Sequence, residues 1–113
     1  MSRKHSLEAL AREQLDAASR APAKRASRTV VGGHERSMRQ TVVALLADET
    51  MAEHENPGEA TVYVIRGRIE VRAGGDSWEG RSGDLLEIPP ERHSLHAIED
   101  SAVLLTVVLR GRD

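Results

Sequence analysis

The sequence has no cysteine and no phenylalanine, and it contains a single tryptophan and a single tyrosine. Without cysteine, disulfides, thiolate zinc sites, iron–sulfur clusters and cysteine nucleophiles are excluded. With so few aromatic side chains, the core must be built from valine, leucine, isoleucine and alanine. The aromatic platforms on which single-stranded nucleic acids stack are also missing. The sequence therefore favours an aliphatic core and a site that uses neither thiolates nor stacking.

Long apolar runs are also absent from the sequence. No stretch approaches the roughly 20 apolar residues that a membrane span needs, and the N-terminus lacks the apolar segment of a signal peptide. A soluble, cytoplasmic protein with no membrane partner is therefore expected. The 113 residues, 39 % of them hydrophobic and 30 % charged, correspond to one domain of ordinary size.

Charge is unevenly distributed along the chain, although the net charge is only −2. Lysine and arginine outnumber the acids in residues 1–39, and the acids predominate in residues 40–113. A basic arm on an acidic body could touch nucleic acid. Such arms more commonly stay solvated or fold back on their own acidic domain, so nucleic-acid binding is not expected. A regulatory role for the arm of residues 3–28 stays open as a hypothesis.

Residues 6–19 have the pattern of an amphipathic helix, with leucines and alanines at helical spacing. Ser6 is a suitable N-cap, and Glu8 lies in the first turn. The apolar stripe is narrow, so the helix needs a surface to lie against. Residues 20–28 contain Pro22 and four cations with no acid, which indicates a linker.

From Thr29 the sequence changes to short β-rich runs separated by turn residues such as Gly74-Gly75-Asp76. The expected division is an N-terminal helix and basic linker over residues 1–28 and a β-barrel over residues 29–113. A spacing of roughly 8–12 residues between runs, with no helical pattern between them, indicates an antiparallel sandwich or barrel. The expected strands cover residues 29–31, 39–46, 51–54, 61–65, 68–72, 77–79, 84–88, 93–98 and 102–110.

Two segments carry a resemblance to a known family. The first, from His54 to Gly67, is HENPGEATVYVIRG, and the second, from Gly83 to His93, is GDLLEIPPERH. Together they resemble the two motifs of the cupin superfamily, and HENPGEAT is similar to a group of small actinobacterial single-domain cupins. The resemblance covers about residues 35–110. It implies an all-β fold, an antiparallel double-stranded β-helix (jelly-roll) cupin barrel, here with a short N-terminal α-helix.

The resemblance also implies a metal site, because the family's first motif places two histidines one residue apart. Residues i and i+2 of a strand point to the same face, so both imidazoles enter the barrel. A carboxylate and a histidine of the second motif complete a set that suits divalent transition metals. In this sequence the surviving histidines are His54 and His93. Asn56 stands at the second histidine position and Ala60 at the acidic position.

A divalent transition metal at His54 and His93 would therefore need a further ligand. Glu59 is one residue out of phase and would face the other way in a regular strand, unless a bulge turns it inward. Gln40 is a second candidate. The alternative is that both histidines simply line a pocket inherited from a metal-binding fold, hydrogen-bonded to each other or to water.

Two main functional hypotheses follow. In the first, the barrel binds a small polar or anionic molecule without catalysis, in a pocket lined by His54, Asn56, His93 and Gln40. In the second, the chain is a metal-dependent enzyme of the isomerase or oxygenase type that uses His54 and His93 with a non-standard third ligand, Glu59 being the obvious one. The catalytic residues of such an enzyme are not identified by the sequence.

A homodimer is expected on physical grounds. A small β-barrel leaves strand edges and a broad apolar face, and both favour pairing with a second copy. The N-terminal helix or the first strand could cross to the partner.

Overall fold

The computed structural model describes residues 3–54 and 58–109, with residues 52–54 described by their backbone alone. This part of the chain is mostly antiparallel strand with one short helix, and the expected all-β jelly roll is confirmed. The elements are α1 (Leu7–Arg20), β1 (Arg25–Val31), β2 (Met38–Leu45), β3 (Thr50–His54), β4 (Gly58–Arg66), β5 (Arg68–Ala73), β6 (Asp76–Arg81), β7 (Leu85–Ile88), β8 (His93–Ala97) and β9 (Ser101–Leu109).

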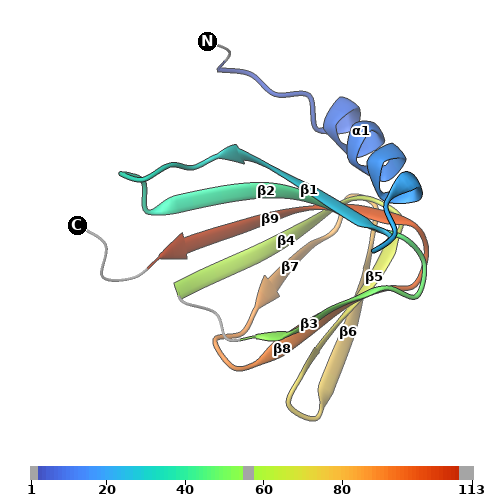
Figure 1. Ribbon diagram of the computed structural model, residues 1–113. Helices are drawn as coiled ribbons and strands as arrows, with labels where there is room; N and C mark the ends of the chain where they lie inside the picture. The colour runs from blue at the N-terminus through green and yellow to red at the C-terminus, as the bar shows by residue number, and fades with distance from the viewer. Residues whose placement is uncertain (1–2, 55–57, 110–113) are drawn as a thin grey trace.

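The strands form two sheets that face each other. The larger sheet has the order β1-β2-β9-β4-β7 and the smaller one the order β3-β8-β5-β6, with antiparallel pairing throughout. Figure 1 shows the two layers spreading apart toward the side where β4 begins and β9 ends. We call this side the open side of the jelly roll.

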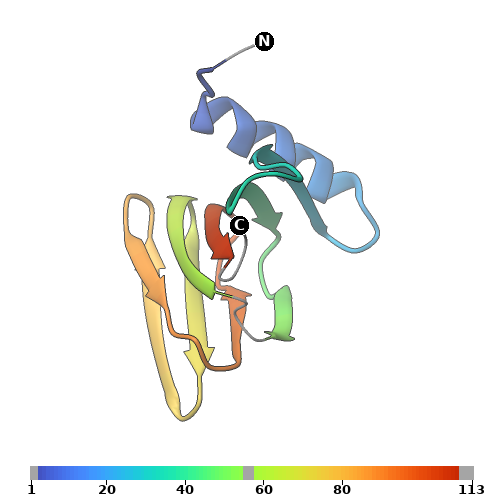
Figure 2. The same ribbon diagram turned by 90° about the vertical axis from the view of Figure 1, so that its left-hand side faces the viewer.

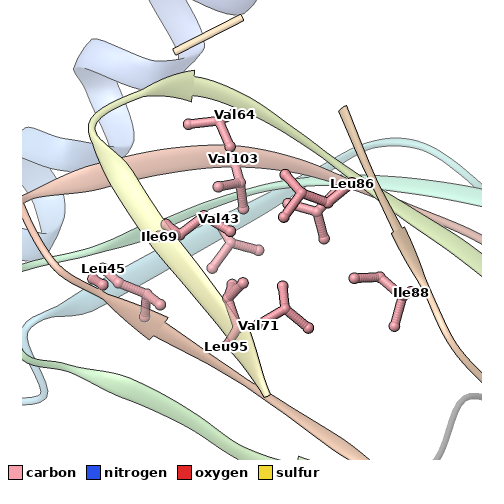
Figure 3. Close-up of a cluster of buried hydrophobic side chains, with 11 residues drawn as sticks. Val43, Leu45, Val64, Ile69, Val71, Leu86, Ile88, Leu95 and Val103 are labelled. Carbon is pink, nitrogen blue, oxygen red and sulfur yellow. The ribbon is translucent and has the colours of Figure 1, made fainter. Parts of the chain in front are cut away.

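The core between the sheets is aliphatic, as the scarcity of aromatic residues requires. Alternate residues of each strand point inward, so Val62 and Val64 of β4 are buried together with Ile69 and Val71 of β5. Figure 3 shows Val64, Ile69 and Val71 among the side chains that meet between the two layers. The cluster comprises Val43, Leu45, Val62, Val64, Ile69, Val71, Leu86, Ile88, Leu95, Ala97 and Val103.

Helix α1 lies on the outer face of the larger sheet, turned away from the smaller one (Figures 1 and 2). Ser6 caps it as expected, since the Ser6 hydroxyl accepts a hydrogen bond from the Ala9 N–H at 3.2 Å. The outward residues Val42 and Ala44 of β2 are fully buried, as is Ala11 of the helix. The narrow apolar stripe of the helix thus covers the outer face of β2. No helix in the described part is long and apolar enough to cross a membrane.

The predicted linker over residues 20–28 is wrong for its second half. A turn occupies residues 21–24, and β1 begins at Arg25, which pairs with Leu45 of β2. Small and charged residues carry no strand pattern of their own, but the backbone of β2 supplies hydrogen-bonding partners to this segment. Tertiary pairing therefore overrides the local signal. The basic side chains of this segment fold back on the domain. Arg25 Nη2 lies 3.5 Å from Glu49 Oε1, and Arg28 Nη1 lies 3.9 Å from Glu13 Oε1.

Candidate ligand-binding cavity

A cavity of about 620 Å³ lies on the inner face of the larger sheet. This volume is within the range of roughly 300–1,000 Å³ that is usual for small-molecule sites. The smaller sheet contributes Met51 and His93 to its wall. The lining residues are Arg25, Ala26, Ser27, Thr29, Arg39, Thr41, Val43, Leu45, Met51, Ala60, His93, Leu105, Val107 and Leu109.

Strand alternation determines which residues line the cavity. The lining residues of β2 are Arg39, Thr41, Val43 and Leu45, which are the odd-numbered residues of that strand. Their character changes along the strand from charged, through hydroxyl, to apolar. The Thr41 hydroxyl is hydrogen-bonded to the Thr29 hydroxyl of β1 at 3.0 Å. The polar lining residues of β2 are therefore at its Arg39 end, whereas Arg25 and Ser27 of β1 lie opposite Leu45 and Val43 at the other end.

His93 is the buried polar residue of the cavity wall, with 6 % of its surface exposed. Its Nδ1 lies 3.0 Å from the Glu91 carbonyl oxygen. Because a carbonyl oxygen only accepts, Nδ1 carries the proton and donates this hydrogen bond. In the neutral ring, Nε2 is then the nitrogen that accepts rather than donates. His93 also borders an apolar void of about 20 Å³ whose other lining residues include Val71 and Leu95 of the core.

The other residues of the first motif are described only in part. His54 is paired opposite His93 in the register of β3 and β8. This backbone register brings the two surviving histidines of the motifs to neighbouring positions on adjacent strands. The side chain of His54 and the whole of Asn56 lie outside the described residues, so their predicted roles in the pocket stay predictions.

Ala60 and Glu59 lie on opposite faces of β4. Ala60 lines the cavity, whereas Glu59 is exposed and borders a separate groove of about 400 Å³ on the outer face, beside Glu87. The strand is regular at this point, so no bulge turns Glu59 inward. The structure therefore does not bring Glu59 to His93.

Gln40 is also placed away from the cavity. It follows Arg39 in β2, so its side chain belongs to the outer face, where Gln40 Nε2 donates to the Thr106 hydroxyl at 3.1 Å. The side-chain amide is therefore engaged by the neighbouring strand. The lining of the cavity contains Arg39 and Thr41 instead.

The described residues do not fit a centre of three histidines and one carboxylate. Among them, no group of three or more histidine, cysteine, aspartate or glutamate side chains lies together. Ala60 occupies the position at which the first motif would supply a carboxylate, and an alanine cannot bind a metal. His93 is the one imidazole that the described residues place in the cavity wall.

The arginines and hydroxyls of the cavity were not anticipated from the sequence. Arg39 and Thr41 lie in a predicted strand, and the inward face of that strand could have been assigned from Val43 by counting in steps of two. Arg25 and Ser27 could not have been found in this way, because their segment was predicted to be a linker.

Comparison with known proteins agrees with this geometry. A family model described as a cupin domain matches residues 41–109. A conserved protein of unknown function from Streptococcus pyogenes is 27 % identical in sequence and superposes with a TM-score of 0.70, over 79 % of this chain and 77 % of that one. KdgF from a Halomonas species is 22 % identical, with a TM-score of 0.66 over 80 % and 83 % of the two chains. A cupin superfamily protein from Desulfitobacterium hafniense is 13 % identical, with a TM-score of 0.69 over 75 % and 77 %. No curated protein is significantly similar in sequence.

Proposed function

Since the chain belongs to the cupin domain family, we propose that it is a binding protein that holds a small polar or anionic organic molecule in the barrel cavity. The observation that carries this proposal is the composition of the cavity. Its described lining combines two guanidinium groups, three hydroxyls and a buried imidazole with an apolar floor. Such a cavity offers many hydrogen-bond donors and no acidic side chain, which suits a guest rich in acceptor oxygens.

A pair of neighbouring residues in β9 allows a controlled test of this proposal. Val107 lines the cavity, and Val108 lines the groove on the outer face. Val107→Trp would fill the cavity mouth, whereas Val108→Trp adds the same side chain outside. The experiment is a calorimetric binding screen with a panel of small carboxylates, sugar acids and neutral polyols.

We expect at least one class of the panel to bind the wild-type protein and Val108→Trp, and to lose binding to Val107→Trp. A circular dichroism spectrum and a melting temperature for each variant establish that it is folded. Equal binding to the two variants would place the ligand elsewhere and overturn the proposal. His93→Ala, which opens the cavity rather than filling it, provides a second variant that should alter affinity if Val107→Trp fails to fold.

The metal-dependent enzyme is a second candidate function, favoured by one observation. The register of β3 and β8 sets the backbone of His54 opposite that of His93, so two histidines stand at neighbouring positions on adjacent strands. Two imidazoles alone hold a divalent metal weakly, and a non-standard third ligand would be required.

Metal analysis of protein purified without an affinity tag separates the two candidates. His93→Ala removes the cavity imidazole, and His96→Ala is the matched control on the same strand, where His96 Nδ1 lies 2.7 Å from the Thr50 hydroxyl. Under the binding-protein proposal, metal stays far below one equivalent in all three samples, even after soaking. Near-stoichiometric iron, manganese, nickel, zinc or copper that is lost only in His93→Ala would favour the enzyme.

A further inference from the structure

We propose that Arg39 selects the charge of the ligand, and that the cavity takes an amphiphilic carboxylate: a molecule with one anionic group at Arg39 and an apolar body over Val43, Leu105 and Val107. This inference rests on the proposed function, because it assumes that the cavity is a binding site. It adds the chemical class of the ligand and the residue that recognises it.

The first step is that the two cavity arginines are not equivalent. Arg25 Nη2 donates to the Thr50 carbonyl oxygen at 3.1 Å and lies 3.5 Å from a Glu49 carboxylate oxygen. Arg39 has no hydrogen bond or ion pair from its side chain to any residue of the described part of the chain. A guanidinium group has five N–H donors in a planar fork that matches a carboxylate. Arg39 is therefore the cation that is available to a ligand.

The second step is the order of groups along the wall. Going inward from Arg39, β2 presents the Thr41 hydroxyl and then the Val43 side chain. On β9, Val107 lies opposite Arg39 and Leu105 lies opposite Thr41. Arg39 stands near the start of β2, on the open side of the jelly roll (Figure 1). A ligand that enters from this side meets the guanidinium with one end and buries the rest against aliphatic side chains.

The third step is the segregation of charge between the two faces of the larger sheet. The described residues lining the cavity include no aspartate or glutamate, while Glu59 and Glu87 border the outer groove on the opposite face. A carboxylate in the cavity would therefore meet cations without facing an acidic side chain of the described lining. A cationic guest would meet two arginines and no acidic side chain of the described lining. The cavity should therefore favour anionic over cationic guests.

Two fluorescent probes test the inference because they share an apolar body and differ in one anionic group. Anilinonaphthalene sulfonate carries a sulfonate, and N-phenylnaphthylamine lacks it. We expect wild-type protein to bind the sulfonate about tenfold more tightly than the neutral probe, a ratio in keeping with one charge-assisted hydrogen-bonded contact. Arg39→Gln should abolish this preference while leaving the affinity for the neutral probe unchanged.

Arg28→Gln is the matched control, because it removes the same charge from the neighbouring strand at a side chain that lies 3.9 Å from Glu13 of the helix. It should retain the preference. Equal affinities for the two probes in the wild-type protein, or a preference that survives Arg39→Gln, would overturn the inference and leave the proposed function intact. If both probes bind Val107→Trp as well as they bind wild-type protein, the cavity is not the site, and the proposed function fails with the inference.

Discussion

At the scale of single residues, Gly67 is the position where the backbone itself imposes the amino acid. It joins β4 to β5 with a φ of 92°, a conformation that side chains rarely adopt. A Cβ atom there would lie 2.5 Å from the Asp100 carbonyl oxygen and 2.8 Å from the Ser101 Cα. Both contacts are with the main chain of the neighbouring segment, which has little freedom to move aside. We therefore expect Gly67→Ala to lower the free energy of unfolding by roughly 2 kcal/mol or more, measured by urea denaturation.

Gly75→Ala is the control for this prediction. Gly75 lies in the turn between β5 and β6, and a Cβ there would meet no atom within 4 Å. The free energy of unfolding of this variant should stay within about 0.5 kcal/mol of the wild-type value. Similar losses in the two variants would show that the close approach of Gly67 to Ser101 does not limit stability.

The same scale shows how far site residues are predictable. His93 was found because its motif survives, and the opposite orientations of Glu59 and Ala60 follow from strand alternation alone. The same alternation, counted from Val43, would have turned Gln40 outward and Arg39 inward. A local pattern does not show that Arg25 is already engaged, because its partners Glu49 and Thr50 come from another part of the chain.

At the scale of elements, an ion pair ties the start of α1 to β4. Arg66 Nη2 lies 3.0 Å from a Glu8 carboxylate oxygen, and its hydrogen bond and positive charge hold the pKa of Glu8 below the ordinary value of 4.5. A carboxyl whose pKa is lower in the folded state stabilises that state above the unfolded pKa. The contribution is lost as the pH falls from about 4.5 through the lowered folded value. Glu8→Gln should therefore reduce the melting temperature slightly at pH 7 and make no difference at pH 2.

A double-mutant cycle with Arg66→Gln checks that the pair is responsible. If the two side chains act through each other, the doubly substituted protein should lose no more stability at pH 7 than Glu8→Gln alone. Additive losses would mean that each residue stabilises the fold independently, and the pH dependence would then need another source.

The elements themselves were largely accessible from the sequence because most strands carry their own signal. The aliphatic runs around Val43, Val64 and Val103 have alternating or continuous apolar character, and glycine turns separate the strands near Gly67 and Gly74. The first four residues of β1 have no comparable apolar pattern. They are held in the sheet by backbone pairing with β2 and by contact with α1. Partner strands that are distant in sequence are invisible to a local pattern.

At the scale of the whole molecule, the outer face of the larger sheet is covered only in part. Helix α1 contacts β1, β2 and β9 most extensively, and β7 forms the far edge of the sheet. Leu85 of β7 is 64 % exposed and lies opposite Tyr63 in the register with β4. An edge strand offers unpaired backbone groups, and an exposed leucine beside a tyrosine offers apolar surface. The homodimer expected from the sequence would therefore use the β7 edge, with two copies related by a two-fold axis.

Sedimentation velocity at several concentrations tests this arrangement. Wild-type protein should sediment as a dimer, and Leu85→Glu should shift it toward the monomer, because like charges would face each other across the two-fold axis. Met38→Glu is the comparison, since Met38 is 40 % exposed on the same face but on β2, three strands away from β7 in the sheet. A dimer that is lost in Met38→Glu and kept in Leu85→Glu would move the interface to the β2 side of the outer face. A wild-type monomer at all concentrations would rule out the dimer and leave Leu85 as an isolated exposed side chain, which soluble proteins tolerate.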